Sequence, residues 1–256
     1  MTERRPRSRV QSVDRAGLLL GLLAEADASG RGLADLAAQL GVARSTAHAM
    51  LRTLEVHGLV AEVSGPRFVL GTGLIRLGDI AAKQLPLADQ ARPALAALAQ
   101  ETGLTTRLAV ADQGFPVFVA RVDGPGFVRF HTPLGGREAP NASAAGKVIL
   151  ADLTEERVRE LVEEVGLPAR TPRTITDVEV LLAELDRVRA RGYAVDDEED
   201  LDGVFCVAAE VRDAGGRLIG ALSTTGITSD RRARSIEDLG AVVRKHAQDL
   251  GTRLAR

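Results

Sequence analysis

The segment from Leu33 to Val60 constrains the fold of this chain more than any other stretch. Two runs of apolar residues at helical spacing lie on either side of Gly41: Leu33, Leu36, Ala37 and Leu40, then Ala47, Met50, Leu51 and Leu54. In each run the apolar residues lie on one face of a short helix, and that face is expected to be buried. Glycine supplies the left-handed conformation that lets the chain leave one helix and enter the next. The segment therefore predicts a helix-turn-helix, the arrangement that places a helix in a groove of DNA.

The outer face of the second predicted helix is polar. The side chains that share this face by helical spacing are Arg44, Ser45, His48 and Arg52, with Thr46 beside them. All of them carry hydrogen-bond donors suited to phosphates and base edges, so we predict that they bind DNA. The alternative is a small helical domain that packs only against protein, but a purely structural helix has no use for such a cluster.

A hairpin is predicted directly after Gly58. The runs Leu59–Val63 and Arg67–Leu70 flank a Ser-Gly-Pro turn, which is typical of two paired strands. This hairpin would be the wing of a winged helix-turn-helix, with Arg67 near its tip as a further DNA contact. The arginine-rich segment 4–9 could follow a phosphate backbone or enter a minor groove as an arm, although solvated disorder is the default expectation for it.

Length and composition are compatible with two domains, because 256 residues exceed the usual single-domain size and 45% apolar residues suffice for two cores. Residues 1–80 carry 10 Lys and Arg against 8 Asp and Glu, so binding of nucleic acid would depend on where the arginines are placed and on two copies of the domain. The single cysteine and the lack of a long apolar run or signal segment predict a disulfide-free cytoplasmic protein without membrane contact. No Cys/His spacing indicates a metal, and we expect no cofactor.

An amphipathic helix is expected to link the two domains. Apolar residues recur at helical spacing from Leu74 to Leu85, and Pro86 stops the pattern. We therefore predict a winged helix-turn-helix domain at residues 1–71, a linker helix at 72–86 and a second domain at 87–256. If the apolar stripe of the linker is not covered within the subunit, it can pair with the same helix of a second subunit.

The second domain alternates between helical and strand patterns. Helices are expected at residues 88–100, 154–165 and 176–191, the last opened by a capping box of Thr176 and Glu179, and from about 235 to the end. Strands are expected at 108–111, 116–120, 127–130, 193–195, 204–208 and 218–222. The sum is an α+β domain, with a central antiparallel sheet flanked by helices.

Three stretches of this domain carry candidate binding groups. The loop Asn141–Lys147 consists of small residues and opens a helix, so its backbone N–H groups can receive an anion or a carbonyl oxygen; tight packing of a helix start is the alternative. In the acidic run 196–200 we expect Asp196 to point inward from the end of a strand and the later carboxylates to stay in solvent. Cys206, Ser223 and Thr225 are small polar groups suited to the floor of a pocket, although Cys in a strand is commonly a core residue and Ser and Thr are commonly edge residues.

Taken together, these stretches resemble the isocitrate lyase regulator (IclR) family of bacterial transcription factors. The segments that carry the resemblance, besides the predicted winged helix, are Leu70–Gly78, Asn141–Lys147, Gly192–Glu199, Gly203–Ala209 and Ala221–Gly226. The resemblance implies an N-terminal winged helix-turn-helix and a C-terminal GAF-like effector-binding domain. It also implies homodimers joined through the DNA-binding domains, which pair further into homotetramers, and double-stranded operator DNA as the macromolecular partner.

The same resemblance implies where a small effector, often a carboxylate, is bound. Carried over by position, backbone N–H groups come from Ala144, Ala145 and Gly146, and side chains come from Asp196, Cys206, Ser223 and Thr225. Two residues depart from the family pattern, because Asn141 stands where the family often has His and Thr225 where a second Ser is frequent. The effector therefore need not be a short keto acid.

The function that we expect first is repression of a catabolic operon that is relieved by its metabolite. Activation by the same kind of protein stays open, because the sequence does not encode the effect on polymerase. A small hydrolase or transferase would use Cys206 or Ser223 as nucleophile, His131 as base and Asp196 to orient it. Against this enzyme, Cys206 lies in an apolar strand with no glycine elbow or helix start to lower its pKa. A scaffold that assembles through the linker helix would leave the wing without a role.

Overall fold

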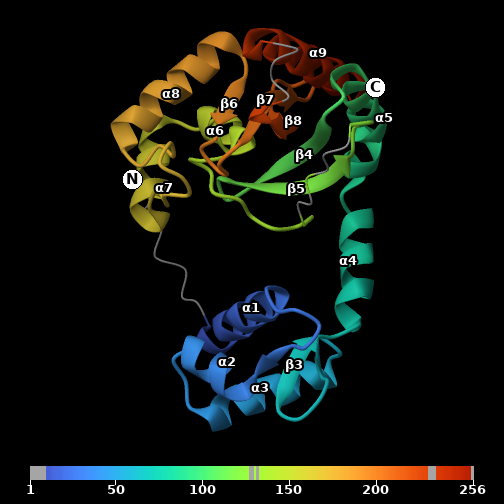
Figure 1. Ribbon diagram of the computed structural model, residues 1–256, viewed down its shortest axis with the longest axis vertical. Coiled ribbons are helices and arrows are strands. Elements are labelled where there is room, and N and C mark those ends of the chain that lie inside the picture. Colours follow the sequence, from blue (N-terminus) through green and yellow to red (C-terminus); the bar gives the residue numbers. More distant parts are fainter. Residues whose placement is uncertain (1–9, 127–129, 131–132, 230–234, 255–256) are drawn as a thin grey trace. The chain divides into compact units, whose positions relative to one another are not determined.

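The computed structural model describes residues 10–126, 130, 133–229 and 235–254, and it divides into two compact units, Met1–Gln84 and Leu85–Arg256. The arginine-rich segment 4–9, His131 and the strand expected at 127–130, apart from Phe130, lie outside the described residues. The elements of the first unit are α1 (Gln11–Ala24), β1 (Arg31–Gly32), α2 (Leu33–Gln39), α3 (Arg44–Val56), β2 (Val60–Glu62), β3 (Arg67–Leu70) and α4 (Gly73–Lys83) (Figure 1).

The predicted helix-turn-helix is confirmed as α2 and α3. Gly41 has φ +63°, the left-handed conformation that the turn between the helices requires. The buried residues that form the core of the unit are Leu19, Leu23, Leu36, Leu51, Leu54, Val60 and Phe68. Two of them come from α1, a helix that the sequence patterns did not predict. This helix packs on the predicted pair and completes a three-helix core.

The predicted hairpin is confirmed as β2 and β3, which pair antiparallel with Val60 opposite Leu70 and Glu62 opposite Phe68. The two-residue strand β1 pairs with the other edge of β3, so the wing is a three-stranded sheet in the order β1-β3-β2. The helix α4 follows and has no buried residue. Its apolar side chains Ile75, Leu77 and Ile80 are exposed in the single chain.

The second unit is the expected α+β domain. Its helices are α5 (Pro86–Thr102), α6 (Ala144–Ala151), α7 (Glu155–Val165), α8 (Val178–Arg191) and α9 (Ile236–Leu254). Its strands are β4 (Thr105–Asp112), β5 (Phe115–Val122), β6 (Ala194–Asp197), β7 (Val204–Arg212) and β8 (Leu218–Ile227). They form one antiparallel sheet in the order β5-β4-β8-β7-β6. The predicted capping box is wrong: the carboxylate of Asp177, and not Thr176, accepts the N–H groups of Glu179 and Val180 at 2.9 and 3.0 Å.

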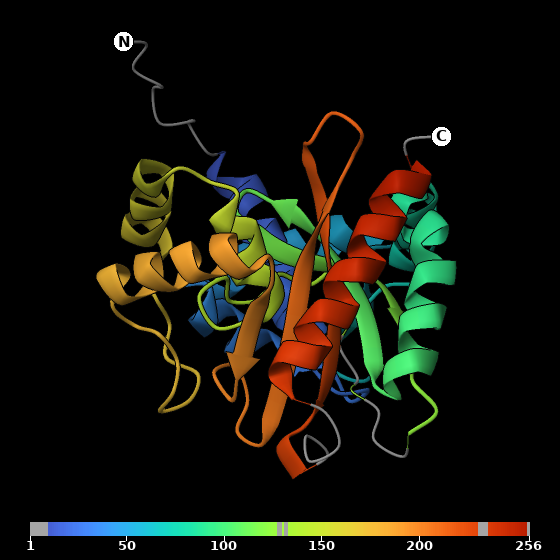
Figure 2. The ribbon, with the colours of Figure 1, turned by 90° about the horizontal axis from the view of Figure 1, so that it is seen from above.

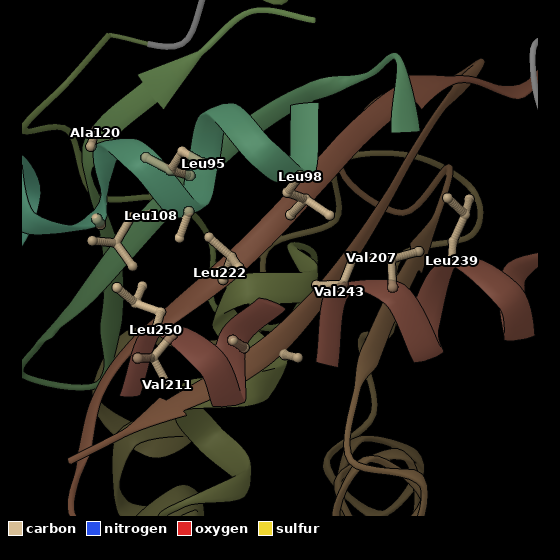
Figure 3. Close-up of a cluster of buried hydrophobic side chains, with 14 of the residues drawn as sticks. Leu95, Leu98, Leu108, Ala120, Val207, Val211, Leu222, Leu239, Val243 and Leu250 are labelled. Atoms are coloured by element: carbon tan, nitrogen blue, oxygen red, sulfur yellow. The ribbon is translucent and has the colours of Figure 1, made fainter. Parts of the chain in front are cut away.

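Each face of this sheet is covered by its own helices. Figure 2 shows α5 and α9 on one side and α6 and α8 on the other. Side chains alternate between the faces of a strand, so neighbouring residues serve opposite layers. The apolar layer under α5 and α9 includes Leu95, Leu98, Leu108, Val207, Leu222, Leu239, Val243 and Leu250 (Figure 3). None of the helices in the described part of the chain has the length and apolar character needed to span a bilayer.

Candidate functional site

The first candidate site is the exposed face of α3. Ala47, Leu51 and Leu54 turn the apolar stripe of this helix into the core. Helical geometry therefore places the predicted DNA-binding side chains outward, and Arg44, Ser45, Thr46 and His48 are all exposed. Among the described residues, none of these four side chains has a hydrogen-bond or ion-pair partner. The structure thus presents one cation, two hydroxyls and an imidazole that are available to an external ligand.

Arg52 lies on the same helix but is already paired. Its guanidinium contacts the carboxylates of Glu55 at 2.6 Å and Glu62 at 2.8 Å, and the latter belongs to β2. The hydrogen bond that Arg52 donates to Glu55, together with the charges of both carboxylates, raises the pKa of Arg52. This side chain joins α3 to the wing, so it would have to leave two carboxylates to reach a phosphate. Its contact with DNA stays a prediction.

Arg67 is held in a similar way. Its Nε donates to the carbonyl of Ser29 at 2.8 Å, and its Nη2 donates to the carbonyl of Gly30 at 2.5 Å and to the hydroxyl of Ser29 at 3.2 Å. The guanidinium therefore ties β3 to the turn before β1. The sequence placed Arg67 at the wing tip but could not show that acceptors 37 and 38 residues away bind its side chain.

The second candidate site is the sheet face under α6. The register places Thr225 opposite Cys206 and Cys206 opposite Asp196, which makes a polar row across β8, β7 and β6. Ser223 lies one pair further along, opposite Arg107 of β4. The sequence predicted that these side chains belong to one site, and strand pairing brings all four predicted residues onto one face. The hydroxyl of Thr225 donates to the sulfur of Cys206 at 3.3 Å.

Arg107 is the member of this row that the sequence reasoning missed. Its side chain is 8% exposed, and its Nη2 donates to the hydroxyl of Thr225 at 2.8 Å and contacts the sulfur of Cys206 at 3.7 Å. The ring of Phe118 lies 4.1 Å from the guanidinium carbon. The sequence did contain a signal for this residue, because alternation along the strand places Arg107 on the same face as Ala109. It was missed because the predicted strand began one residue later, at Leu108.

Asp196 points inward, as expected. Its Oδ1 accepts the N–H groups of Glu199 at 2.7 Å and Asp200 at 3.2 Å, and the residue is 4% exposed. Burial raises the pKa of Asp196 to about 7, although both backbone hydrogen bonds and the charge of Lys147 favour the ionised form.

The expectation that the carboxylates after Asp196 stay in solvent is wrong for Glu199. Its Oε1 contacts the ammonium group of Lys147 at 2.5 Å, and the side chain of this lysine is 1% exposed. The same ammonium group donates to the carbonyl of Val195 at 2.6 Å. A buried lysine requires a counter-charge, so the chain turns Glu199 inward beside Asp196.

The start of α6 differs in part from the prediction. Ser143 caps the helix, and its hydroxyl accepts the N–H of Gly146 at 3.2 Å, so this N–H group is already used within the fold. Gly146 has a steric role, because a Cβ there would lie 2.4 Å from the carbonyl oxygen of Pro140. Among the described residues, no hydrogen-bond acceptor is paired with the N–H groups of Ala144 and Ala145. These two N–H groups remain as candidate ligand donors.

The chemistry of the site favours binding over catalysis. Burial raises the pKa of the Cys206 thiol despite the nearby Arg107, so the thiolate that a nucleophile needs is disfavoured.

Asn141 is buried and donates to the carbonyls of Ile175 at 2.9 Å and Pro168 at 3.3 Å, which ties the loop before α6 to the segment before α8. Within the described ranges, no three His, Cys, Asp or Glu side chains gather as metal ligands.

Comparisons with known proteins cover nearly the whole chain. Residues 12–64 match the IclR helix-turn-helix domain, and residues 80–252 match the bacterial transcriptional regulator IclR C-terminal domain. The transcriptional repressor IclR of Escherichia coli is 34% identical over 248 residues, which are 94% of this chain and 89% of the repressor.

Solved structures give the same result. The IclR transcriptional regulator from Alicyclobacillus acidocaldarius superposes with a TM-score of 0.81 at 30% identity, over 96% of this chain and 99% of that chain. An IclR homolog from Microbacterium hydrocarbonoxydans, solved in complex with 4-hydroxybenzoate, has a TM-score of 0.76 at 24% identity and covers 95% of this chain and 98% of its own. At that identity the second likeness concerns the fold alone.

Proposed function

Because this chain belongs to the IclR family of bacterial transcriptional regulators, we propose that it represses an operon by binding operator DNA through α3. In this proposal a small metabolite, bound on the sheet face under α6, releases the operator. The observation that carries the proposal is the outer face of α3, where Arg44, Ser45 and His48 are exposed and have no partner among the described residues. Repression is supported by the E. coli relative, which is named a transcriptional repressor.

The DNA-binding role divides the three arginines predicted to contact DNA, Arg44, Arg52 and Arg67, into two groups. Arg44 is free to contact a base edge or a phosphate, and it lies in the first turn of α3, where unpaired backbone N–H groups also attract phosphate. Arg52 and Arg67 instead hold the wing in place. We propose that Arg44 contributes direct contacts and that the other two contribute mainly by fixing the position of the wing.

The test measures binding to upstream DNA by fluorescence anisotropy. Arg44→Ala should weaken binding by about 1–3 kcal/mol, which is roughly 5- to 150-fold. Arg92→Ala is the matched control, because Arg92 is 62% exposed, forms an ion pair with Asp89 and lies in the second unit. Unchanged affinity in Arg44→Ala, with the fold intact by circular dichroism, would remove α3 as the reading helix. Binding should also weaken steeply as salt is raised.

The proposed effector site rests on the polar row of Asp196, Cys206, Thr225 and Ser223. A ligand shifts DNA affinity only if it binds two arrangements of the protein unequally, and about 1–3 kcal/mol of difference is useful. The double variant Cys206→Ala with Ser223→Ala should keep operator binding and lose release by those metabolites that stabilise the wild-type chain in a thermal-shift screen. Unchanged metabolite affinity in calorimetry would exclude both side chains from the site.

We further propose that the chain assembles as a homodimer through its first unit, with dimers pairing into tetramers. The support is the apolar face of α4, where Ile75 is 74% exposed and Ile80 is 41% exposed in the single chain. A dimer would present two α3 helices to two half-sites of an operator. The double variant Ile75→Glu with Ile80→Glu should lower the mass of the assembly measured by light scattering. The same variant should weaken DNA binding measured by anisotropy. A dimer that survives these charges would exclude this face.

A further inference from the structure

A cavity of about 650 Å³ lies where β6 stops and β7 continues. β6 pairs with β7 only as far as Ala208, whereas β7 runs on to Arg212. Figure 2 shows the hairpin of β7 and β8 extending beyond β6. In the described part of the chain no other strand pairs with this length of β7 on that side, and the cavity lies there between the end of α8 and the second half of α9. None of its lining residues belongs to the proposed effector site.

Arg244 of α9 lines this cavity and has few partners of its own. Its Nη1 donates to the carbonyl of Arg191 at 3.2 Å, and among the described residues its guanidinium has no other hydrogen-bond or ion-pair partner. Gly192 makes room for this side chain, because a Cβ there would lie only 3.0 Å from the Cδ of Arg244. The remaining N–H groups of the guanidinium are therefore available to a molecule in the cavity.

The other two arginines of the lining, Arg189 and Arg212, are already bound within the fold. Arg189 donates to one carboxylate and two carbonyl groups, and Arg212 donates to two carboxylates and one carbonyl group. The partners are Asp186, Ala151 and Leu153 for the first, and Asp152, Glu210 and Gly216 for the second. These two guanidiniums hold the walls of the cavity together and leave Arg244 as the arginine that can take a new partner.

The lining also leaves the charge of Arg244 without compensation. Among the described residues that form it, three are arginines and two, Glu210 and Asp213, carry carboxylates. Both carboxylates are already paired, Glu210 with Arg212 at 2.7 Å and Asp213 with Arg217 at 3.0 Å. An anion that enters the cavity therefore meets a cation with no competing carboxylate beside it.

Polar groups suited to hydroxyls surround this cation. Gln248 and Thr252 follow Arg244 at intervals of four residues, so they share its face of α9 and line the same cavity. The side-chain amide of Gln248 has no partner among the described residues. The hydroxyl of Thr252 donates to the backbone carbonyl of Gln248 at 3.0 Å, which leaves its oxygen able to accept. On the β7 wall, Oε1 of Glu210 accepts no hydrogen bond from the described residues.

A phosphate ester suits this lining better than a carboxylate does. A phosphate group carries about two negative charges near neutral pH and three strong acceptor oxygens. A planar guanidinium binds two such oxygens in parallel. The volume of the cavity lies within the range of about 300–1,000 Å³ that is typical of small-molecule sites. The described lining holds no aromatic ring, so the rest of the ligand is bound by its hydroxyl groups and not by stacking.

We propose that this cavity is a second ligand site, which binds the phosphate ester of a sugar or polyol. Arg244 binds the phosphate, and Gln248, Thr252 and Glu210 bind hydroxyl groups of the same molecule. The inference goes beyond the proposed function, because the site shares no residue with the sheet face under α6 and does not require an effector there.

The test measures binding to the full chain by calorimetry. The probes are the monophosphate esters of glycerol, ribose and glucose, together with the three unphosphorylated parents and inorganic phosphate. At least one ester should bind, and its parent should bind about fivefold more weakly or less. Inorganic phosphate should also bind more weakly than that ester, because it lacks the hydroxyl groups of the polyol. Failure of all three esters to bind, or equal binding of the best ester with its parent or with inorganic phosphate, would overturn the proposal.

Substitutions on α9 locate the site. Arg244→Gln should weaken binding of the ester about fivefold or more, and Arg244→Lys should recover part of that loss. Arg253→Gln is the matched control, because Arg253 is an exposed arginine of the same helix that does not line the cavity. Equal losses in the two Gln variants would reduce the effect to general charge and overturn the proposal. If Arg244→Gln does not fold, Gln248→Ala decides, since it should weaken binding about threefold and an unchanged affinity would contradict the site.

Two further measurements separate this site from the proposed function. Loss of ester binding in Cys206→Ala with Ser223→Ala would place the ester on the sheet face under α6 and overturn the inference. Wild-type chain that binds no upstream DNA in anisotropy would contradict the proposed function and not this site, whose readout is the calorimetry of the ester.

Discussion

The two faces of the five-stranded sheet are built from alternate residues of the same strands, yet they differ in character. Leu108, Val207 and Leu222 face α5 and α9 and pack with leucines and valines. Their immediate neighbours Arg107, Cys206 and Ser223 face α6 and form hydrogen bonds and polar contacts. One face stabilises the fold by apolar burial, and the other keeps charges and hydroxyls out of water. The comparison teaches that a wholly apolar layer and a layer of buried polar contacts are separated within a strand by a single residue step.

The largest change in stability is expected on the polar side of the sheet, when the buried ion pair of Lys147 and Glu199 is broken. Lys147→Met leaves Glu199 without its counter-charge, so we expect a loss of about 3–5 kcal/mol in the free energy of unfolding. Urea denaturation measures this loss. Lys83→Met is the matched control, because Lys83 is 72% exposed beside Asp79 and should lose less than about 1 kcal/mol. Equal losses in the two variants would show that burial does not distinguish this pair.

On the apolar face, Leu222→Ala should lower the free energy of unfolding by roughly 2–5 kcal/mol, because it deletes a fully buried side chain and leaves a cavity. The control is Leu201→Ala, where the side chain is 56% exposed and the loss should be within about 0.5 kcal/mol. Urea denaturation measures both. A small loss at Leu222 would mean that this face does not carry the stability that we assign to it.

The pH dependence of stability tests the polar face again. The pKa of Asp196 is raised from its ordinary value of 3.8 to about 7, so the folded chain binds this proton more tightly than the unfolded chain. The contribution of Asp196 to stability therefore falls as pH rises from about 4 to 7 and is level above that. Relative to wild type, Asp196→Asn should gain about 1–3 kcal/mol between pH 5 and pH 8.

Asn keeps an oxygen that can accept the N–H groups of Glu199 and Asp200, so the loop should stay in place. Denaturation at several pH values measures the difference. The control Asp186→Asn changes an aspartate that is 76% exposed, and its difference from wild type should not vary in this range. A flat difference for Asp196→Asn would mean that its carboxyl is not desolvated.

The smallest effect on stability is expected for the hydroxyl of Ser223, which is 3.4 Å from the carbonyl of Arg107. Ser223→Ala should lose less than about 1 kcal/mol. Thr224→Val is a close control, since its hydroxyl is also 3.4 Å from a β4 carbonyl, that of Thr105, but lies on the opposite face. Only Ser223→Ala should change release of DNA by a metabolite that stabilises the wild-type chain, as measured by anisotropy. An equal change in Thr224→Val would contradict the division between the faces.

Local patterns in the sequence predicted much of this fold. The apolar spacing around Gly41 predicted α2 and α3, and the turn after Val63 predicted the wing. The helix α1 was missed because the run Leu18–Leu23 is apolar on every side and holds Gly21, so no single face stands out. The strand β1 has two residues and is defined by its pairing with β3, so no local sequence pattern could predict it.

The sequence predicts which side chains face the site where strand alternation alone determines their direction. It does not predict them where contacts with residues far away in the sequence determine it. The family resemblance assigned Asp196, Cys206 and Thr225 to one site, and strand alternation places them on the same face. The inward turn of Glu199 does not follow from alternation, because it depends on Lys147, which lies 52 residues away, and on the left-handed φ of +65° at Glu198. The pairing of Arg52 with Glu62 is likewise a product of the folded wing.

The joint between the wing and α4 leaves no room for a side chain. A Cβ at Gly71 would lie 2.2 Å from the carbonyl oxygen of Gly58, and a Cβ at Gly73 would lie 2.7 Å from the same oxygen. That oxygen also accepts the N–H of Gly73 at 2.9 Å, so the end of α3 and the start of α4 are in direct backbone contact. A rotation imposed on α4 would therefore be passed to α3 almost without slack, and even an alanine at either glycine should loosen that coupling.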